Sequence, residues 1–286
     1  MLYFIDYENQ KGQGLRISDG LESNFALYEI DGVSAPDAQI NTEHTPGYDG
    51  SSLLSASVPK RNIVLKILLR GDITEAKKEL YKVFQVKREG MLHYKSDGWD
   101  VQIPCYTEKL EIPPMSRPLI ATVSLLCTSP FWQAIEESIA DLRNVTDNFY
   151  FPLVLYEEGI ALGIINPHYT VNIFNPGDIP LGMTVEFRAV GSVKNPKIFN
   201  TETFEYLQIN ADLMDGDIVE ICTVPKKKRV TLIRNGERVN YFNYLDDGSN
   251  LSLQLDEGDN EFRYTAESGE DSLYMKINYT PLYVGV

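Results

Sequence analysis

The first half of the chain alternates short apolar runs with turn-forming residues. Three runs have the composition of strands: Leu2–Tyr7, Gly14–Ser18 and Phe25–Ile30. Asp19-Gly20 and Asp31-Gly32 follow two of them. Because Asp-Gly pairs readily adopt the positive φ angles of tight turns, hairpins are predicted here.

Regular alternation is clearest in Arg61–Arg70, where apolar side chains occupy every second position: Ile63, Leu65, Ile67 and Leu69. This pattern predicts a strand with one buried face. Further strands are predicted at Met91–Lys95, Asp100–Tyr106, Lys109–Ile112 and Pro118–Cys127. The last of these is apolar on both faces, as expected of a strand that is buried on two sides.

One segment, Asp72–Gly90, has a helical pattern. Its apolar residues form a single stripe at helical spacing: Ile73, Ala76, Leu80, Val83 and Phe84. Asp72 is placed to cap the first turn, and Glu75 can reach back as in a capping box. Gly90 stands where a C-terminal cap belongs. We expect this helix to pack across its own sheet, and a partner-binding surface is the alternative interpretation.

The segment Asn41–Ser57 is polar and rich in Gly, Ser and Thr, with Pro46 and Gly47 as turn formers. It predicts a long exposed loop. Loops of this length are uncommon inside compact domains and are usually functional or disordered.

From about Asn148 onward, short strand-like runs recur between turn signals. The clearest hairpin turn is Asn235-Gly236, which lies between two apolar runs. Strands at this spacing predict a β-sandwich of about 130 residues. Gln133–Asp147 fits a helix, a strand or a linker, and the domain boundary is placed there. The expected fold is therefore mainly β: an N-terminal α+β domain at residues 1–140 and a C-terminal sandwich at residues 141–286.

Composition narrows the function classes. With 43% hydrophobic and 23% charged residues, the chain has the make-up of a soluble globular protein. Its 26 basic and 41 acidic residues argue against broad nucleic-acid binding, which needs a basic face. The N-terminus lacks the features of a signal peptide, and no apolar run is long enough to span a membrane.

The three cysteines, Cys105, Cys127 and Cys222, are odd in number and lack close spacing, so they fit neither a disulfide framework nor a metal knuckle. They are predicted to be buried thiols in a protein made in a reducing cytosol.

Catalytic chemistry is not visible in the sequence. His44, His93 and His168 lie far apart, and no nucleophile elbow, phosphate loop or dinucleotide fingerprint is present. Acidic pairs such as Asp246-Asp247 and Asp256-Glu257 fall in turns and match no calcium loop. Solvated turns are the favoured interpretation over glycoside hydrolysis. No catalytic, cofactor-binding or metal-binding residue is therefore predicted, and we expect no enzymatic activity.

Pro225–Val230 carries four consecutive basic residues, Lys226 to Arg229, and could pass for a nuclear-import signal or a nucleic-acid patch. Strand-like runs flank it, so the turn of a hairpin is favoured. An exposed basic contact point for an acidic neighbour is a further possibility.

Several short sequence segments resemble those of the distal tail protein family of siphophages and related prophages. They are Gly14–Ser18, Arg61–Ile67, Lys87–Tyr94, Leu126–Trp132, Leu255–Tyr264 and Tyr279–Val286. The resemblance covers most of the chain as a pattern of architecture plus phrases, with no single diagnostic motif.

The resemblance implies a structural protein of the phage tail tip or baseplate. An N-terminal belt domain would close into a hexameric ring, and a galectin-like or carbohydrate-module-like sandwich would follow. The ring would join the tail tube protein to the tail-tip protein and to receptor-binding parts. The protein would be made in the bacterial cytoplasm and reside at the virion tail tip. Thr45–Ser57 is a candidate for contact with a neighbouring subunit, because ring closure needs a heterologous interface.

The alternative is a carbohydrate-binding protein whose sandwich recognises host-surface glycans. Sugar sites use exposed aromatic rings beside polar groups, and Tyr241, Phe242 and Tyr244 could supply such rings. Alternation along a strand would place Tyr241 and Phe242 on opposite faces, with at least one of them in the core.

Overall fold

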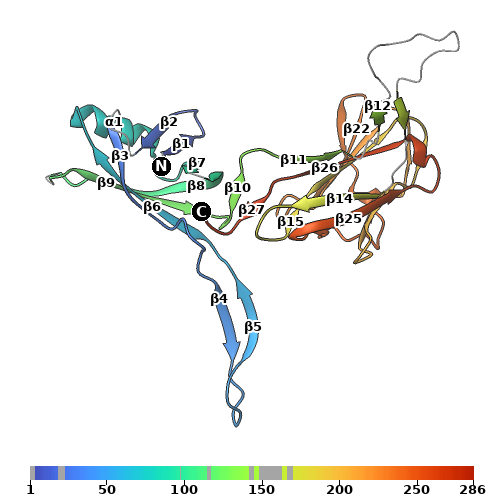
Figure 1. Ribbon diagram of the computed structural model, residues 1–286, viewed down its shortest axis with the longest axis horizontal. Coiled ribbons are helices and arrows are strands. Elements are labelled where there is room, and N and C mark those ends of the chain that lie inside the picture. The colour runs from blue at the N-terminus through green and yellow to red at the C-terminus, as the bar shows by residue number, and fades with distance from the viewer. Residues whose placement is uncertain are drawn as a thin grey trace, which may run out of the picture. The chain divides into compact units, whose positions relative to one another are not determined.

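The computed structural model describes residues 4–18, 23–96, 98–114, 117–141, 145–147, 163–165 and 170–286. The chain forms two compact units (Figure 1). The first contains Met1–Ile135 together with Leu282–Val286, and the second contains Glu136–Pro281. The sequence-based division into residues 1–140 and 141–286 assumes consecutive segments, whereas here the C-terminal residues return to the first unit.

The first unit is built around a closed β-barrel. Its strands are β1 (Phe4–Asn9), β2 (Gly14–Ser18), β3 (Phe25–Asp31), β6 (Arg61–Leu69), β7 (Glu89–Ser96), β8 (Trp99–Glu111) and β9 (Ile120–Cys127). They are ordered β8-β7-β1-β2-β3-β6-β9, and β9 pairs again with β8. Neighbours are antiparallel except β2 and β3, which are parallel.

Strand β8 closes this barrel because it pairs on both edges. Residues Trp99–Tyr106 pair with β7, and Tyr106–Glu111 pair with β9. The register shifts between Thr107 and Lys109, where a β-bulge lets the strand bend. Near its start, β8 also pairs with β10 (Trp132–Ala134).

Side chains alternate between the barrel interior and its outer surface. In β6, Ile63, Leu65 and Ile67 are fully buried, as the sequence pattern predicts. Strand β9 was expected to be buried on both faces, and this expectation is wrong. Its core residues Ala121, Val123, Leu125 and Cys127 alternate with partly exposed ones, because a barrel strand has one inner and one outer face.

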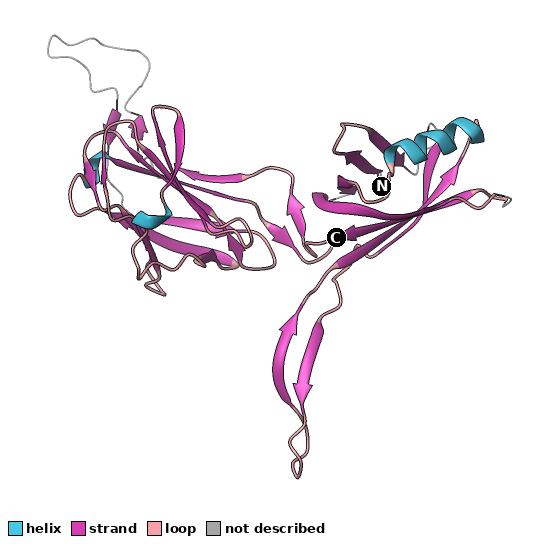
Figure 2. Cartoon of the chain, turned by 180° about the vertical axis from the view of Figure 1, so that it is seen from behind, coloured by secondary structure: helices cyan, strands magenta, loops and turns pink. Residues whose placement is uncertain are grey.

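The helix α1 (Ile73–Val83) lies beside the barrel strands (Figure 2). Its side chains Ala76, Leu80 and Val83 belong to the barrel core. Asp72 caps it as predicted, since its Oδ1 accepts hydrogen bonds from the amides of Thr74 (2.9 Å) and Glu75 (3.2 Å).

The helix ends seven residues before Gly90, contrary to prediction. Phe84 leaves the helix and stacks on Tyr7 with ring centroids 4.4 Å apart, and Lys87 takes a φ of 68°. Gly90 lies instead in β7, where a Cβ atom would come within 2.5 Å of the Tyr7 hydroxyl. Close packing against Tyr7, rather than helix termination, therefore requires glycine at this position.

The C-terminal segment completes the first unit. Strand β27 (Leu282–Tyr283) pairs with β10, and the Val286 amide donates to the Val33 carbonyl (3.2 Å). Arg61 is 3% exposed and donates to the carbonyls of Gly32 (3.1 Å), Val33 (2.9 Å) and Val284. Burial lowers the pKa of its guanidinium. We call this arrangement, Arg61 with Val33 and Val284, the root clasp.

The second unit is a β-sandwich. Its larger sheet has the order β11-β26-β16-β21-β22-β23 and its smaller sheet β14-β25-β18-β19. The larger sheet comprises β11 (Ser138–Asp141), β16 (Thr184–Ala189), β21 (Ile218–Cys222), β22 (Arg229–Arg234), β23 (Glu237–Asn240) and β26 (Leu273–Tyr279). The smaller comprises β14 (Thr170–Asn175), β18 (Lys197–Asn200), β19 (Tyr206–Gln208) and β25 (Gly258–Thr265). Apolar residues of both sheets, such as Phe187, Ile221 and Phe262, are fully buried.

Short elements complete this unit. They are β12 (Val145–Asp147), β13 (Gly163–Ile165), β15 (Leu181–Gly182), β17 (Val193–Lys194), β20 (Asp212–Leu213), β24 (Gln254–Leu255), and the 3₁₀ turns η1 (Phe242–Tyr244) and η2 (Glu270–Ser272). The segment left open as helix or strand contains β10, β11 and β12. Asn235 and Gly236 have φ angles of 52° and 82°, which confirms the predicted two-residue hairpin.

We expect Arg61→Lys to weaken the root clasp, because an ammonium group cannot reach three carbonyls as a guanidinium does. The free energy of unfolding of the first unit should fall by about 2 kcal/mol. Exchange of the Val286 amide with solvent deuterium should accelerate. Arg16→Lys, at an exposed ion pair with Asp6, is the matched control and should change neither measurement. Unchanged exchange at Val286 in Arg61→Lys would contradict the assignment.

A second prediction concerns Asp217, whose buried carboxylate accepts two hydrogen bonds from Arg234 (2.7 and 2.6 Å). This contact, together with the Met214 amide, lowers the pKa of Asp217. Its stabilising contribution is therefore present at neutral pH and is lost as the pH falls below about 4. Asp217→Asn should lower the free energy of unfolding by about 1–2 kcal/mol at pH 7. The difference from wild type should shrink in acid, as measured by denaturant titration at several pH values.

Candidate functional site

A hairpin that extends away from the barrel is the most distinctive surface feature of the first unit (Figure 1). It consists of β4 (Gln39–Glu43) and β5 (Ser52–Ser57) and lies between the barrel strands β3 and β6. We call residues 36–57 the arm. Asn41–Ser57 was predicted to be a loop. It is instead largely an antiparallel ladder, because the backbone groups of β4 and β5 hydrogen-bond to each other without a buried side-chain face.

Every side chain of β4 and β5 is exposed. Among them are large apolar residues: Ile40 is 63% exposed, Leu53 64% and Leu54 63%. Register pairs Thr42 with Leu53 and Ile40 with Ala56, so that Ile40 and Leu53 share one face, and Leu54 lies at a β-bulge. Tyr48, in the turn, is 75% exposed.

Local interactions hold the arm in shape. Asn41 Nδ2 donates to Ser55 Oγ (2.9 Å), and His44 Nδ1 lies 2.9 Å from the Gly50 carbonyl oxygen. Within the described residues, β4 and β5 pair only with each other. An isolated two-stranded hairpin is marginally stable in water, so an arm of this kind gains stability when another surface covers it.

The root clasp fixes the start of the arm. The Val33 carbonyl accepts hydrogen bonds from Arg61 and from the Val286 amide, and Trp132 Nε1 also donates to it (3.2 Å). A Cβ atom on Gly285 would lie 2.9 Å from the Ala35 nitrogen, so the C-terminal segment 282–286 runs close to the residue that directly precedes the arm. The sequence did not single out this role of Arg61, although a cation in phase with the buried residues Ile63, Leu65 and Ile67 was a usable signal.

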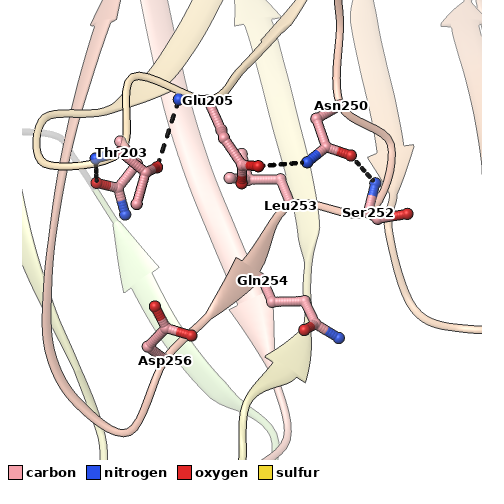
Figure 3. A pocket seen from close by; sticks show the side chains of 8 residues that line it. Thr203, Glu205, Asn250, Ser252, Leu253, Gln254 and Asp256 are labelled. Carbon is pink, nitrogen blue, oxygen red and sulfur yellow. Dashed lines mark hydrogen bonds between the residues drawn. The ribbon is translucent and has the colours of Figure 1, made fainter. Parts of the chain in front are cut away.

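A polar hollow of about 230 Å³ lies in the second unit (Figure 3). It is lined by Asn200, Thr203, Glu205, Asn250, Ser252, Leu253, Gln254 and Asp256. Asn250 Nδ2 donates to Glu205 Oε1 (2.8 Å), and the Ser252 amide donates to Asn250 Oδ1 (2.8 Å). Next to these residues in sequence, Phe204 is 73% exposed and has a φ of 59°.

Other residues singled out in the sequence lie apart. His44 is in the arm and His93 is in β7, while His168 is outside the described residues. No three His, Cys, Asp or Glu side chains are grouped to hold a metal ion in the described part of the chain. The three cysteines are unpaired and buried as predicted, and contact with Cys127 and burial raise the pKa of Cys105.

The basic segment is an exposed turn between β21 and β22, which confirms the hairpin interpretation. Lys228 Nζ donates to Ser252 Oγ (2.5 Å).

The acidic turns differ from one another. Asp256 and Glu257 are exposed, whereas Asp246 accepts hydrogen bonds from Asn210 (2.8 Å) and Tyr206 (2.9 Å), which lower its pKa.

The aromatic cluster does not follow strand alternation. Phe242 and Tyr244 lie in η1 and are 48% and 47% exposed, and Tyr241 stacks on Tyr244 with centroids 4.1 Å apart. None of the three belongs to the core, because the chain turns into a 3₁₀ helix after Asn240. No helix among the described residues has the length and apolar character of a membrane span.

Two family models match the chain. The phage tail protein RIFT-related domain matches residues 17–127, and the C-terminal domain of the siphovirus-type tail component matches residues 176–283. No curated protein sequence matches the chain. The first model spans most of the barrel unit, and the second spans most of the sandwich.

Solved structures share the fold. The distal tail protein of phage SPP1 is 14% identical with a TM-score of 0.70, and the alignment covers 99% of each chain. A chain of the phage P2 baseplate, in its activated conformation with calcium, is 10% identical with a TM-score of 0.50 and 98% coverage of each chain. Since two tail-specific models account for both units in order, the chain belongs to the distal tail protein family of siphophages and is a structural component of the phage tail.

Proposed function

We propose that this chain closes into a hexameric ring that connects the tail tube to the tail-tip and receptor-binding proteins, and that the arm is a contact between subunits. The observation that carries this proposal is the exposure of Ile40, Leu53 and Leu54 on a hairpin whose two strands pair only with each other within the described residues. Covering these three side chains removes apolar area from water, which favours association.

The hub role is supported by the similar SPP1 protein, which is described as a paradigm of the hub adsorption apparatus in phages that infect Gram-positive bacteria. The count of six rests on the family resemblance. Proteins of this kind have a scaffolding role, and we propose no catalytic step. Buried, unpaired cysteines fit synthesis in the reducing cytoplasm of the host before incorporation at the tail tip.

Removing the apolar side chains of the arm should disrupt the ring. We expect Ile40→Ser combined with Leu53→Ser to convert hexamers into monomers in native mass spectrometry, because polar side chains lose the favourable burial. The control, Phe174→Ser with Met214→Ser, removes two exposed apolar side chains from the second unit and should leave hexamers. Hexamers that persist in the arm variant would exclude the arm as the contact.

A second candidate function is glycan binding by the sandwich, and the polar hollow favours it. Carboxylate, amide and hydroxyl groups suit sugar hydroxyls, and an exposed aromatic ring such as Phe204 can stack on a pyranose face. Phe204 also holds a left-handed φ, a conformation that is costly for an aromatic residue and concentrates at binding sites.

Glycan arrays probed with the full chain test this candidate. Binding should be lost in Glu205→Gln and in Phe204→Asn, since asparagine tolerates the left-handed φ but lacks the ring. Phe242→Asn removes an exposed ring elsewhere in the same unit and should have no effect. Absence of wild-type binding across the array would eliminate the candidate and leave the scaffold role intact.

A further inference from the structure

The arm is acidic as well as apolar. Residues 36–57 contain three carboxylates, Asp37, Glu43 and Asp49, and neither lysine nor arginine. All three carboxylates are exposed, and none forms an ion pair with a described residue. A surface that receives the arm therefore needs cations beside apolar side chains.

Helix α1 and the residues after it present such a surface. In a chain of net charge −15, residues 72–88 carry five basic and three acidic side chains. Lys78, Tyr81 and Lys82 are spaced i, i+3, i+4 and therefore share one face of the helix. All three are exposed, Tyr81 by 56%, and Val86 just beyond the helix is 54% exposed. We call Lys78, Tyr81, Lys82 and Val86 the helix face.

The cations of the helix face are available for a partner. Within the described structure, neither Lys78 nor Lys82 lies within ion-pair distance of a carboxylate, including those of Glu75 and Glu79 on the same helix. The opposite side of the helix is not accessible to a partner, because Ala76, Leu80 and Val83 pack into the barrel core.

The basic turn at Lys226–Arg229 is the competing receiver. It lacks a large exposed apolar side chain to cover Ile40 and Leu53, and Lys228 already bonds Ser252. The helix face offers both cations and apolar area, and on this ground it fits the arm better.

Both views of the molecule show the arm and helix α1 extending from different sides of the first unit (Figures 1 and 2). Two different patches that complement each other make a heterologous interface, and such interfaces generate rings when the rotation closes. We propose that the acidic arm of one copy docks on the helix face of the next copy. This inference rests on the proposed ring and assigns its two contact surfaces.

Charge reversal tests the pairing in the full-length protein. The arm variant, Glu43→Lys with Asp49→Lys, and the helix variant, Lys78→Glu with Lys82→Glu, each place like charges across every interface. Each variant alone should be monomeric in native mass spectrometry, with the ring fraction reduced at least about tenfold. Both variants should keep the wild-type circular dichroism spectrum and a cooperative melting transition, because all four side chains are exposed.

Mixing the two variants gives the decisive measurement. A lysine-bearing arm meets a glutamate-bearing helix at one interface, and the natural pair meets at the next. A 1:1 mixture should therefore form alternating hexamers of three copies each, identified by mass. Since the contact is electrostatic and exposed, raising the salt concentration should weaken the wild-type ring.

Lys226→Glu with Lys227→Glu is the matched control, since it changes net charge as the helix variant does but alters the competing receiver. It should retain the ring. Rings that persist in the arm or helix variant, or folded variants that fail to combine, would overturn this pairing while leaving the ring proposal standing. A wild-type chain that stays monomeric at all concentrations would overturn both.

Discussion

The first unit depends on one strand that changes partner along its length. β8 pairs with β7 in its first half and with β9 in its second, and the bulge between Thr107 and Lys109 makes the change of direction possible. This closure gives Ile63, Leu65 and Ile67 an interior to fill and provides the wall on which α1 packs. A closed barrel also satisfies its own strand edges, so its body offers few backbone groups to another chain.

The arm, in contrast, has unpaired strand edges within the described residues, because β4 and β5 form a separate two-stranded sheet. It is inserted between β3 and β6, which remain paired beneath it, so it extends from the barrel without interrupting the closure. Its ladder satisfies its inward backbone groups but leaves both outer edges and all its side chains in solvent. Folding of the single chain cannot resolve this exposure, whereas association can. A closed barrel with an exposed apolar extension provides a physical basis for assembly.

Local sequence patterns predicted the elements that depend only on interactions between residues close together in the sequence. Alternation identified β6, the Asp72 cap identified the start of α1, and Asn235-Gly236 identified a hairpin. Features set by distant contacts were missed. The end of α1 depends on the stacking of Phe84 against Tyr7, which lies in β1, far from the helix in sequence. The arm was predicted to be a loop because strands are recognised in a sequence by apolar residues that alternate with polar ones. That alternation arises from one buried face, and the arm has none. The root clasp joins residues more than two hundred positions apart, from Arg61 to Val284.

That clasp has a consequence for the order in which the molecule is made. Ribosomes release a chain from its N-terminus onward, and domains generally fold as units while synthesis continues. Here β27 and its neighbours, although they belong to the barrel unit, are translated after the whole sandwich. A nascent chain can thus form its barrel strands and its arm early, but it cannot lock the base of the arm until residues 282–286 emerge. The hydrogen bonds at the base of the arm therefore form only after the sandwich strands have also been translated, although the arm itself is encoded before them.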